Sequence, residues 1–125
     1  MSKPAHKEVK RFGAAGSGLK LFFRTEVHAK VHGFAALMAI GMGFLFHIER
    51  LEWALLMFCI VLVIGLEIIN TTIEVLCDKI EPHYDLQIKA VKDMAAGAVL
   101  VAAIGSLLIG CFIFLPKVYT LLFSG

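Results

Sequence analysis

Three long apolar segments, separated by short polar ones, dominate the pattern of the chain. They cover residues 29–48, 53–76 and 94–115, and each is close to the ~20 residues that a helix needs to cross the hydrocarbon of a bilayer. Gly33, Gly41 and Gly43 interrupt the first segment, but glycines in membrane helices also allow close packing against neighbours. The pattern predicts an all-α fold with three transmembrane helices.

The residues before the first span have a different, amphipathic pattern. Between residues 9 and 28, cations separate apolar side chains at Val9, Phe12, Leu19 and Phe23. This pattern is typical of a helix that lies on a membrane surface. We therefore expect an N-terminal surface helix followed by three spans, all within one domain of residues 1–125.

Composition supports the membrane assignment. Of the 125 residues, 59% are hydrophobic and 18% are charged, and the mean hydropathy is +0.84. A soluble chain of this size could not bury so much apolar surface in one core. We do not expect a nucleic acid as a partner. The three cysteines show no C-x-x-C spacing and lie in apolar stretches, so we expect buried, reduced thiols.

The positive charges indicate how the chain is oriented in the membrane. Of the twelve Lys and Arg residues, seven lie before or at the start of the first span and three lie in the connection between the second and third spans; Arg50 and Lys117 are the other two. Positive charge favours the cytoplasmic side. The sequence therefore predicts a multi-pass protein whose N-terminus and second loop are cytoplasmic.

The second span carries an unusual set of polar residues. At 100° per residue, all of them lie within about 60° of Glu67 around the helix axis. An ionised side chain in hydrocarbon costs about 2.5–3.5 kcal/mol on insertion scales, so such residues usually face a polar interior and have a function. The polar residues that share this face are Glu67, Asn70, Thr71, Glu74 and Asp78.

The depth of these residues suggests which substrates could reach them. Counting from Trp53 at ~1.5 Å per residue, Glu67 lies about 21 Å inward and Glu74 about 31 Å inward. A water-soluble phosphoryl donor could reach Glu74 at the cytoplasmic boundary, whereas a lipid hydroxyl could reach Glu67. This is the arrangement that a lipid kinase needs.

Phosphoryl transfer requires a base near the attacking hydroxyl, oxygen ligands for Mg²⁺, and cations on the phosphates. Glu67 fits the base. Glu26 and Glu74 fit the metal ligands, and Lys92 fits the cation that contacts the phosphates of ATP. The groups that would orient the others are Asn70 and Asp93.

Two motifs carry a family resemblance. The segment Glu67-Ile-Ile-Asn70-Thr-Thr-Ile-Glu74 is followed by Asp78 and then by Val91-Lys92-Asp93-Met-Ala-Ala-Gly-Ala98. This combination resembles the prokaryotic diacylglycerol kinase and undecaprenol kinase family. The resemblance implies an ATP- and Mg²⁺-dependent lipid kinase of the inner (cytoplasmic) membrane, assembled as a homotrimer of three-span subunits, each with a surface helix.

The resemblance also implies roles for individual residues. By position, Glu67 matches the catalytic base, Glu26 and Glu74 match the metal-binding glutamates, and Asn70 matches an active-site position. Thr72 stands where alanine is common, and Thr25-Glu26-Val27-His28 replaces the Thr-Glu-Arg-Asn of many undecaprenol kinases. The positions that match nucleotide contacts are Lys92, Asp93, Asp78 and Lys20.

The acceptor lipid stays open between undecaprenol and diacylglycerol. The Pro82-His83-Tyr84 loop and the Leu115-Pro116-Lys117 segment look closer to the undecaprenol branch, so the resemblance favours undecaprenol. Phosphorylation would give undecaprenyl phosphate or phosphatidic acid, respectively.

A small proton-coupled transporter that uses Glu67 as its carrier is the alternative function. It would need an acidic residue near the midplane with access from both sides, whereas here the polar groups gather at one end of the span. A purely structural membrane protein is a further alternative. We interpret the histidines as interfacial or loop residues and not as ligands; those concerned are His28, His32, His47 and His83.

Overall fold

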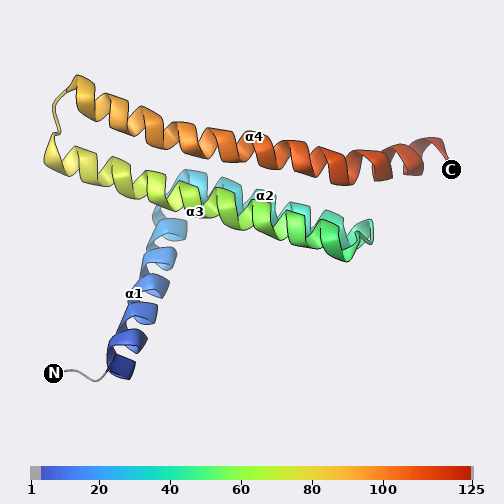
Figure 1. Ribbon diagram of the computed structural model, residues 1–125, viewed down its shortest axis with the longest axis horizontal. Helices are drawn as coiled ribbons and strands as arrows, with labels where there is room; N and C mark the ends of the chain where they lie inside the picture. The colour runs from blue at the N-terminus through green and yellow to red at the C-terminus, as the bar shows by residue number, and fades with distance from the viewer. Residues whose placement is uncertain (1–3, 125) are drawn as a thin grey trace.

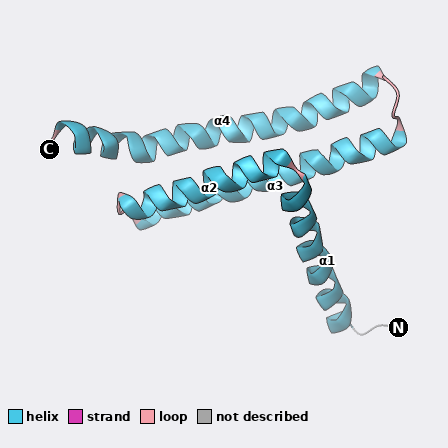
Figure 2. Cartoon of the chain, turned by 180° about the vertical axis from the view of Figure 1, so that it is seen from behind, coloured by secondary structure: helices cyan, strands magenta, loops and turns pink. Residues whose placement is uncertain are grey.

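The computed structural model describes residues 4–124, which form four helices in a row and no strand (Figure 2). In chain order they are α1 (Pro4–Thr25), α2 (Val27–Leu45), α3 (Arg50–Ile80) and α4 (Leu86–Phe123) (Figure 1). Three of them, α2, α3 and α4, are long and apolar enough to cross a membrane. The prediction of an all-α fold with three spans is confirmed.

Helix α1 stands apart from the other three. Figure 1 shows it projecting steeply away from their common axis, with Phe22 buried and Glu26 in an extended conformation at the corner where α2 begins. It runs from residue 4 to residue 25, whereas the pattern predicted a surface helix over residues 9–28. A helix turned away from the bundle in this way can lie in the plane of a membrane surface.

Helix α2 ends three residues before the predicted end of the first span, because the chain turns there. His47 has a φ of 52°, and the four residues between Leu45 and Arg50 reverse the direction of the chain. Helices α3 and α4 are 31 and 38 residues long, so both extend beyond the predicted spans. We call the α2–α3 turn and the adjoining part of α4 the turn end of the bundle, and the α3–α4 connection its loop end.

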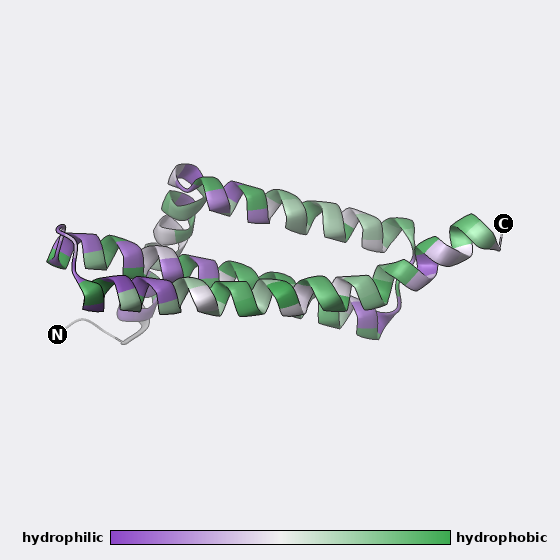
Figure 3. Ribbon diagram, turned by 90° about the horizontal axis from the view of Figure 1, so that it is seen from above, coloured by the Kyte–Doolittle hydropathy of each residue, from purple (hydrophilic) through white to green (hydrophobic). Residues whose placement is uncertain are grey.

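An ion pair joins α3 to α4 at each end of their antiparallel contact. At the loop end Lys92 pairs with Asp78, and at the turn end Lys117 Nζ lies 2.8 Å from Glu52 Oε2. From Glu52 to Asp78, α3 rises about 39 Å, which exceeds the ~30 Å thickness of the hydrocarbon. Both pairs can therefore lie outside the hydrocarbon, and together they fix the register of α3 against α4. Figure 3 shows the corresponding pattern: the midsections are mostly hydrophobic, and hydrophilic residues gather at the loop end and at the turn between α2 and α3.

The turn end holds the apolar core. Ile48, Leu56, Ile113 and Phe114 are buried against one another, and the Trp53 ring packs on α2. A Cβ atom at Gly43 would lie 2.6 Å from Cη2 of Trp53, closer than two carbon atoms can approach without repulsion. Glycine at this position is what lets the indole ring lie directly on the α2 backbone.

Substituting Gly43→Ala should therefore destabilise the α2–α3 hairpin. We expect a loss of about 1–3 kcal/mol from overpacking, measured as a lower Tm by the fluorescence of the protein's one tryptophan in detergent micelles. The matched control is Gly41→Ala, since a side chain there meets nothing within 4 Å and alanine favours a helix. Equal Tm values for the two variants would contradict this account of Gly43.

The Glu52 carboxylate has two partners at the turn end. It accepts hydrogen bonds from Lys117 Nζ at 2.9 and 2.8 Å, and from the backbone N–H of Glu49 at 3.0 Å. These hydrogen bonds, the one from Lys117 foremost, lower the pKa of Glu52 from its ordinary value of 4.5. Glu52 precedes the predicted second span, so this contact belongs to the membrane interface.

The stability that Lys117 provides should depend on pH in the acid range. Because the pKa of Glu52 is depressed in the folded state, the contribution is fully present above pH 4.5 and is lost as the pH falls through the depressed pKa. We expect Lys117→Met to lower Tm at pH 7 and the gap from the unmodified protein to close towards pH 3. A gap that stays constant over this range would show that Lys117 stabilises the bundle only through its packing.

Candidate functional site

The candidate site is built on the α3 face that carries Glu67 and Asn70. Both residues are buried, with 6% and 8% of the residue surface exposed. They lie on the face that also buries Leu56, Cys59 and Cys77, because residues three, four, seven or eight positions apart recur on one side of a helix. Two polar residues thus occupy positions that an ordinary membrane helix would give to apolar packing.

Asn70 links this buried face to Glu74 one turn further along. Its Nδ2 donates a hydrogen bond of 3.2 Å to Glu74 Oε1, so the amide orients that carboxylate. The other amide atom, Asn70 Oδ1, is buried without a hydrogen-bond partner among the described residues. A buried carbonyl oxygen without a partner costs about 1–3 kcal/mol, and such an atom is available to a ligand or an ion.

Glu74 and Asp78 are exposed, although they continue the same face. Helix α2 begins beside the middle of α3, where α1 turns away, and therefore does not cover the loop-end part of α3 (Figure 1). The predicted face accordingly has a buried part at Glu67 and Asn70 and an open part at Glu74 and Asp78. The open part can be reached from water.

The predicted metal ligands are carboxylates of the kind that Mg²⁺ prefers. Glu26 is half-buried at the α1–α2 corner, and its carboxylate does not cap α2, so its oxygens are not used by the helix end. Glu74 is held by Asn70, whose orphaned Oδ1 adds a hard oxygen nearby. Two carboxylates together with substrate phosphates are a usual Mg²⁺ donor set, so the residue types fit the ion. Within residues 4–124 no three His, Cys, Asp or Glu side chains form a group that could hold a metal by themselves.

Two lysines at the loop end are paired with carboxylates, and one of them, Lys92, is predicted to contact ATP. Lys92 donates to Asp78, and this hydrogen bond raises the pKa of the Lys92 ammonium, which keeps it charged at neutral pH. Lys89 donates to Asp93 at 2.6 Å. These pairs lie just before the predicted third span, where an incoming nucleotide would meet them.

The structure brings some of the predicted site residues into contact with one another, but not all of them. It connects Asn70 with Glu74 and Lys92 with Asp78. It pairs Asp93 with Lys89, a residue without a predicted catalytic role. Lys20 is exposed on α1, and within residues 4–124 it has no hydrogen bond or ion pair to another predicted site residue.

Sequence reasoning missed a partner of Glu67. His32 Nε2, on α2, lies 3.6 Å from Glu67 Oε2, and the His32 side chain is 26% exposed. From the sequence alone this histidine is expected to be an interfacial residue. The register of the α2–α3 hairpin is the signal that could have identified this pair. Counted away from the turn, starting at the Gly43–Trp53 contact, His32 lies about three helical turns along α2 and Glu67 about four turns along α3.

This arrangement can support phosphoryl transfer between water and the membrane. A buried carboxylate is positioned to take a proton, exposed carboxylates can bind a cation, and a lysine with a raised pKa can neutralise phosphate charge. Electrostatic stabilisation and positioning are the main requirements of this reaction.

Comparison with known proteins identifies relatives over nearly the whole chain. The sequence profile described as prokaryotic diacylglycerol kinase matches residues 13–114, a range that includes every candidate site residue. The undecaprenol kinase of Bacillus subtilis (strain 168) is 41% identical over 108 residues, which are 86% of this chain and 88% of that protein.

Two diacylglycerol kinases are also similar. That of Synechocystis sp. (strain PCC 6803) is 34% identical over 112 residues, which cover 89% of this chain and 64% of that protein. That of Escherichia coli (strain K12) is 29% identical over 105 residues, which cover 84% of this chain and 86% of that protein.

The geometry of Asn70 predicts that it contributes little to stability. Substituting Asn70→Leu removes a buried oxygen that has no partner and keeps most of the side-chain volume. It also removes the hydrogen bond to Glu74, but the Glu74 carboxylate is exposed and can bind water instead. Apolar replacement of such groups can be nearly neutral, so we expect the free energy of unfolding to change by less than about 1 kcal/mol. Asn70→Asp, which introduces a charge at the same buried position, should lower Tm clearly in the same thermal assay. A large loss of stability in the leucine variant would assign Asn70 to the framework of the bundle.

Proposed function

This chain belongs to the prokaryotic diacylglycerol kinase family, and we propose that its acceptor is undecaprenol. It is an integral membrane lipid kinase, and such an enzyme transfers a phosphoryl group from ATP. The preference for undecaprenol is supported by the 41% identity to the Bacillus subtilis undecaprenol kinase, against 34% and 29% to the two diacylglycerol kinases. The product would be undecaprenyl phosphate.

Glu67 is the proposed catalytic base. The observation that carries this assignment is its burial, with 6% of the residue exposed in the apolar midsection of α3. In the proposed step, the hydroxyl oxygen of the lipid attacks the γ-phosphorus of ATP, the bond from that phosphorus to the ADP oxygen breaks, and the hydroxyl proton passes to the Glu67 carboxylate. ADP leaves with the charge that the broken bond gives it.

Other residues would bind and orient the donor. Glu26 and Glu74 would hold Mg²⁺, which supplies neutralisation of charge on the phosphates when it is bound. Asn70 would keep the Glu74 carboxylate in place, consistent with its 3.2 Å hydrogen bond. Lys92 would exchange its partner Asp78 for a phosphate oxygen, with Asp78, Asp93 and Lys20 contacting the nucleotide.

The membrane setting follows from the charge distribution. The excess of Lys and Arg before α2 and around the α3–α4 connection supports a cytoplasmic N-terminus and a cytoplasmic loop end, where ATP is available. We place the protein in the inner (cytoplasmic) membrane. This orientation brings the exposed carboxylates to the cytoplasmic side and Glu67 to the lipid side.

A homotrimer is the proposed assembly, as the family resemblance implies. Added side chains at Gly97 and Gly105 of α4 would meet nothing within 4 Å, so these backbone positions are open to a second copy. Small residues on exposed helix faces allow helices to approach closely in membranes.

The test is phosphorylation of lipid by the purified protein in mixed micelles with labelled ATP and Mg²⁺, supplied with either undecaprenol or dioleoylglycerol. We expect label mainly in undecaprenol. Substituting Glu67→Gln should lower kcat about 10²–10⁴-fold, the usual size of a lost general base. The control is Glu8→Gln, an exposed carboxylate on α1 outside the matched residues 13–114.

Two results would contradict parts of the proposal separately. Label mainly in dioleoylglycerol would overturn undecaprenol as the acceptor and leave the kinase assignment intact. Full turnover by the Glu67→Gln variant would remove Glu67 from the role of base.

A further inference from the structure

The contact between α2 and the buried glutamate of α3 has no role in the function described above. His32 Nε2 lies 3.6 Å from Glu67 Oε2, and the exposed fractions of the two side chains are 26% and 9%. A carboxylate at this depth is unfavourable unless it has a partner, and membrane-embedded charges usually pair with one another or with polar groups. Among the described residues, His32 is the ionisable side chain that lies within ion-pairing distance of Glu67.

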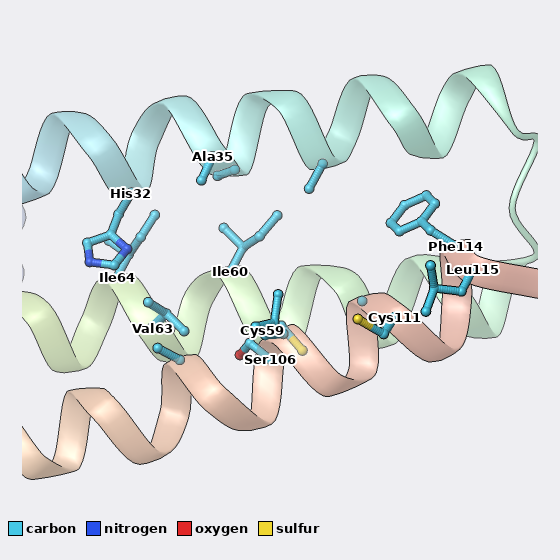
Figure 4. A pocket seen from close by; sticks show the side chains of 15 residues that line it. His32, Ala35, Cys59, Ile60, Val63, Ile64, Ser106, Cys111, Phe114 and Leu115 are labelled. Carbon is cyan, nitrogen blue, oxygen red and sulfur yellow. The ribbon is translucent and has the colours of Figure 1, made fainter. Parts of the chain in front are cut away.

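The surroundings of His32 are mostly apolar. Its ring lines an apolar groove of about 410 Å³ between α2, α3 and α4. Figure 4 shows His32 at one end of this groove, with Phe114 and Leu115 towards the other. An electrostatic contact in such surroundings is stronger than the same contact in water. His32 is therefore in contact both with Glu67 and with the lining of the apolar groove.

We propose that His32 is a positioning residue for the phosphoryl-transfer step, which holds the Glu67 carboxylate through Oε2 so that Oε1 faces the acceptor hydroxyl. The inference rests on the proposed function, because it assumes that Glu67 takes the proton of the lipid hydroxyl. His32 does not exchange a proton with the substrate. It acts through Glu67, by fixing the side-chain torsions of its carboxylate. The Asn70 amide donates to Glu74 instead, so within the described residues it makes no hydrogen bond that would orient Glu67.

The 3.6 Å separation is compatible with this role. Catalytic hydrogen bonds are often long in the absence of substrate and shorten when the reacting complex forms. The atom involved is Nε2, the far nitrogen of the ring, so the proposal distinguishes between two conservative replacements. Glutamine extends its amide nitrogen to about the distance of Nε2, whereas the amide of asparagine reaches only as far as Nδ1.

The experiment compares kcat and KM of four variants in the mixed-micelle assay with undecaprenol, Mg²⁺ and ATP. His32→Ala should lower kcat about 10- to 100-fold, the range expected when a catalytic group loses its position, with KM for ATP unchanged within twofold. His32→Gln should restore kcat to within about fivefold of the unmodified protein, and His32→Asn should not. The control is His28→Ala, an exposed histidine one turn earlier on α2, which should keep full activity.

A second comparison tests whether His32 acts through Glu67. In the Glu67→Gln background, adding His32→Ala should lower the residual rate by less than twofold, because residues that act as a unit are not additive. Thermal unfolding monitored by Trp53 fluorescence should show the His32 variants to be folded. Non-additive rates in folded variants would indicate positioning, because a general loss of stability cannot produce them.

The outcomes separate this inference from the proposed function. If the unmodified protein and His28→Ala transfer phosphate but His32→Ala keeps kcat within twofold, the positioning role is wrong and the kinase stands. A loss in His32→Ala that glutamine and asparagine restore equally, or that adds fully to Glu67→Gln, would also overturn it. If the unmodified protein labels neither lipid, the proposed function fails and the role of His32 fails with it.

Discussion

The thickness of the hydrocarbon layer is the constraint on which the rest of this structure depends. Helices α3 and α4 are held together by one ion pair at each end, Glu52 with Lys117 and Asp78 with Lys92. The two pairs are about 39 Å apart along α3, which leaves a few ångströms at either side of a ~30 Å hydrocarbon layer. Charge is stable at these positions and costly between them. Any polar residue in the interval therefore needs a partner within the protein, and Glu67, about 16 Å from Asp78 along the helix, is such a residue.

The unequal lengths of the helices divide the polar face of α3 into two environments. Helix α2 has 19 residues and α3 has 31, and the turn between them is short, so the N-terminal end of α2 lies beside the middle of α3. Glu67 lies beside α2 and is buried, whereas Glu74 lies beyond it and is exposed. Two glutamates two turns apart on one helix face thus have different surroundings. In the proposed reaction the exposed carboxylate suits an ion and the buried one suits a proton.

Much of this arrangement is predictable from the sequence, because each feature is periodic or local. The spans follow from the length of the apolar segments, and the shared face of Glu67, Asn70 and Glu74 follows from the helical repeat. The ends of the helices were less predictable: α2 stops at Leu45 because of the backbone conformation at His47, which no apolar pattern reveals. Contacts between helices were the least predictable, since they depend on register. His32 and Glu67 are 3.6 Å apart only because the position of Trp53 on Gly43 sets how α2 and α3 align.

The polar face of α3 begins in water and ends in hydrocarbon. The two substrates of a lipid kinase explain this placement, because they are found in different media. A long-chain alcohol cannot leave the membrane to meet ATP, because each methylene group moved into water costs about 0.8 kcal/mol. ATP cannot enter the hydrocarbon, because its phosphate charges would lose their hydration. The reaction must therefore occur where a chain of polar groups leads from one medium into the other. The step of about 10 Å from Glu74 to Glu67, with Asn70 between them, provides such a path on one helix, and the partner on α2 makes its buried end stable.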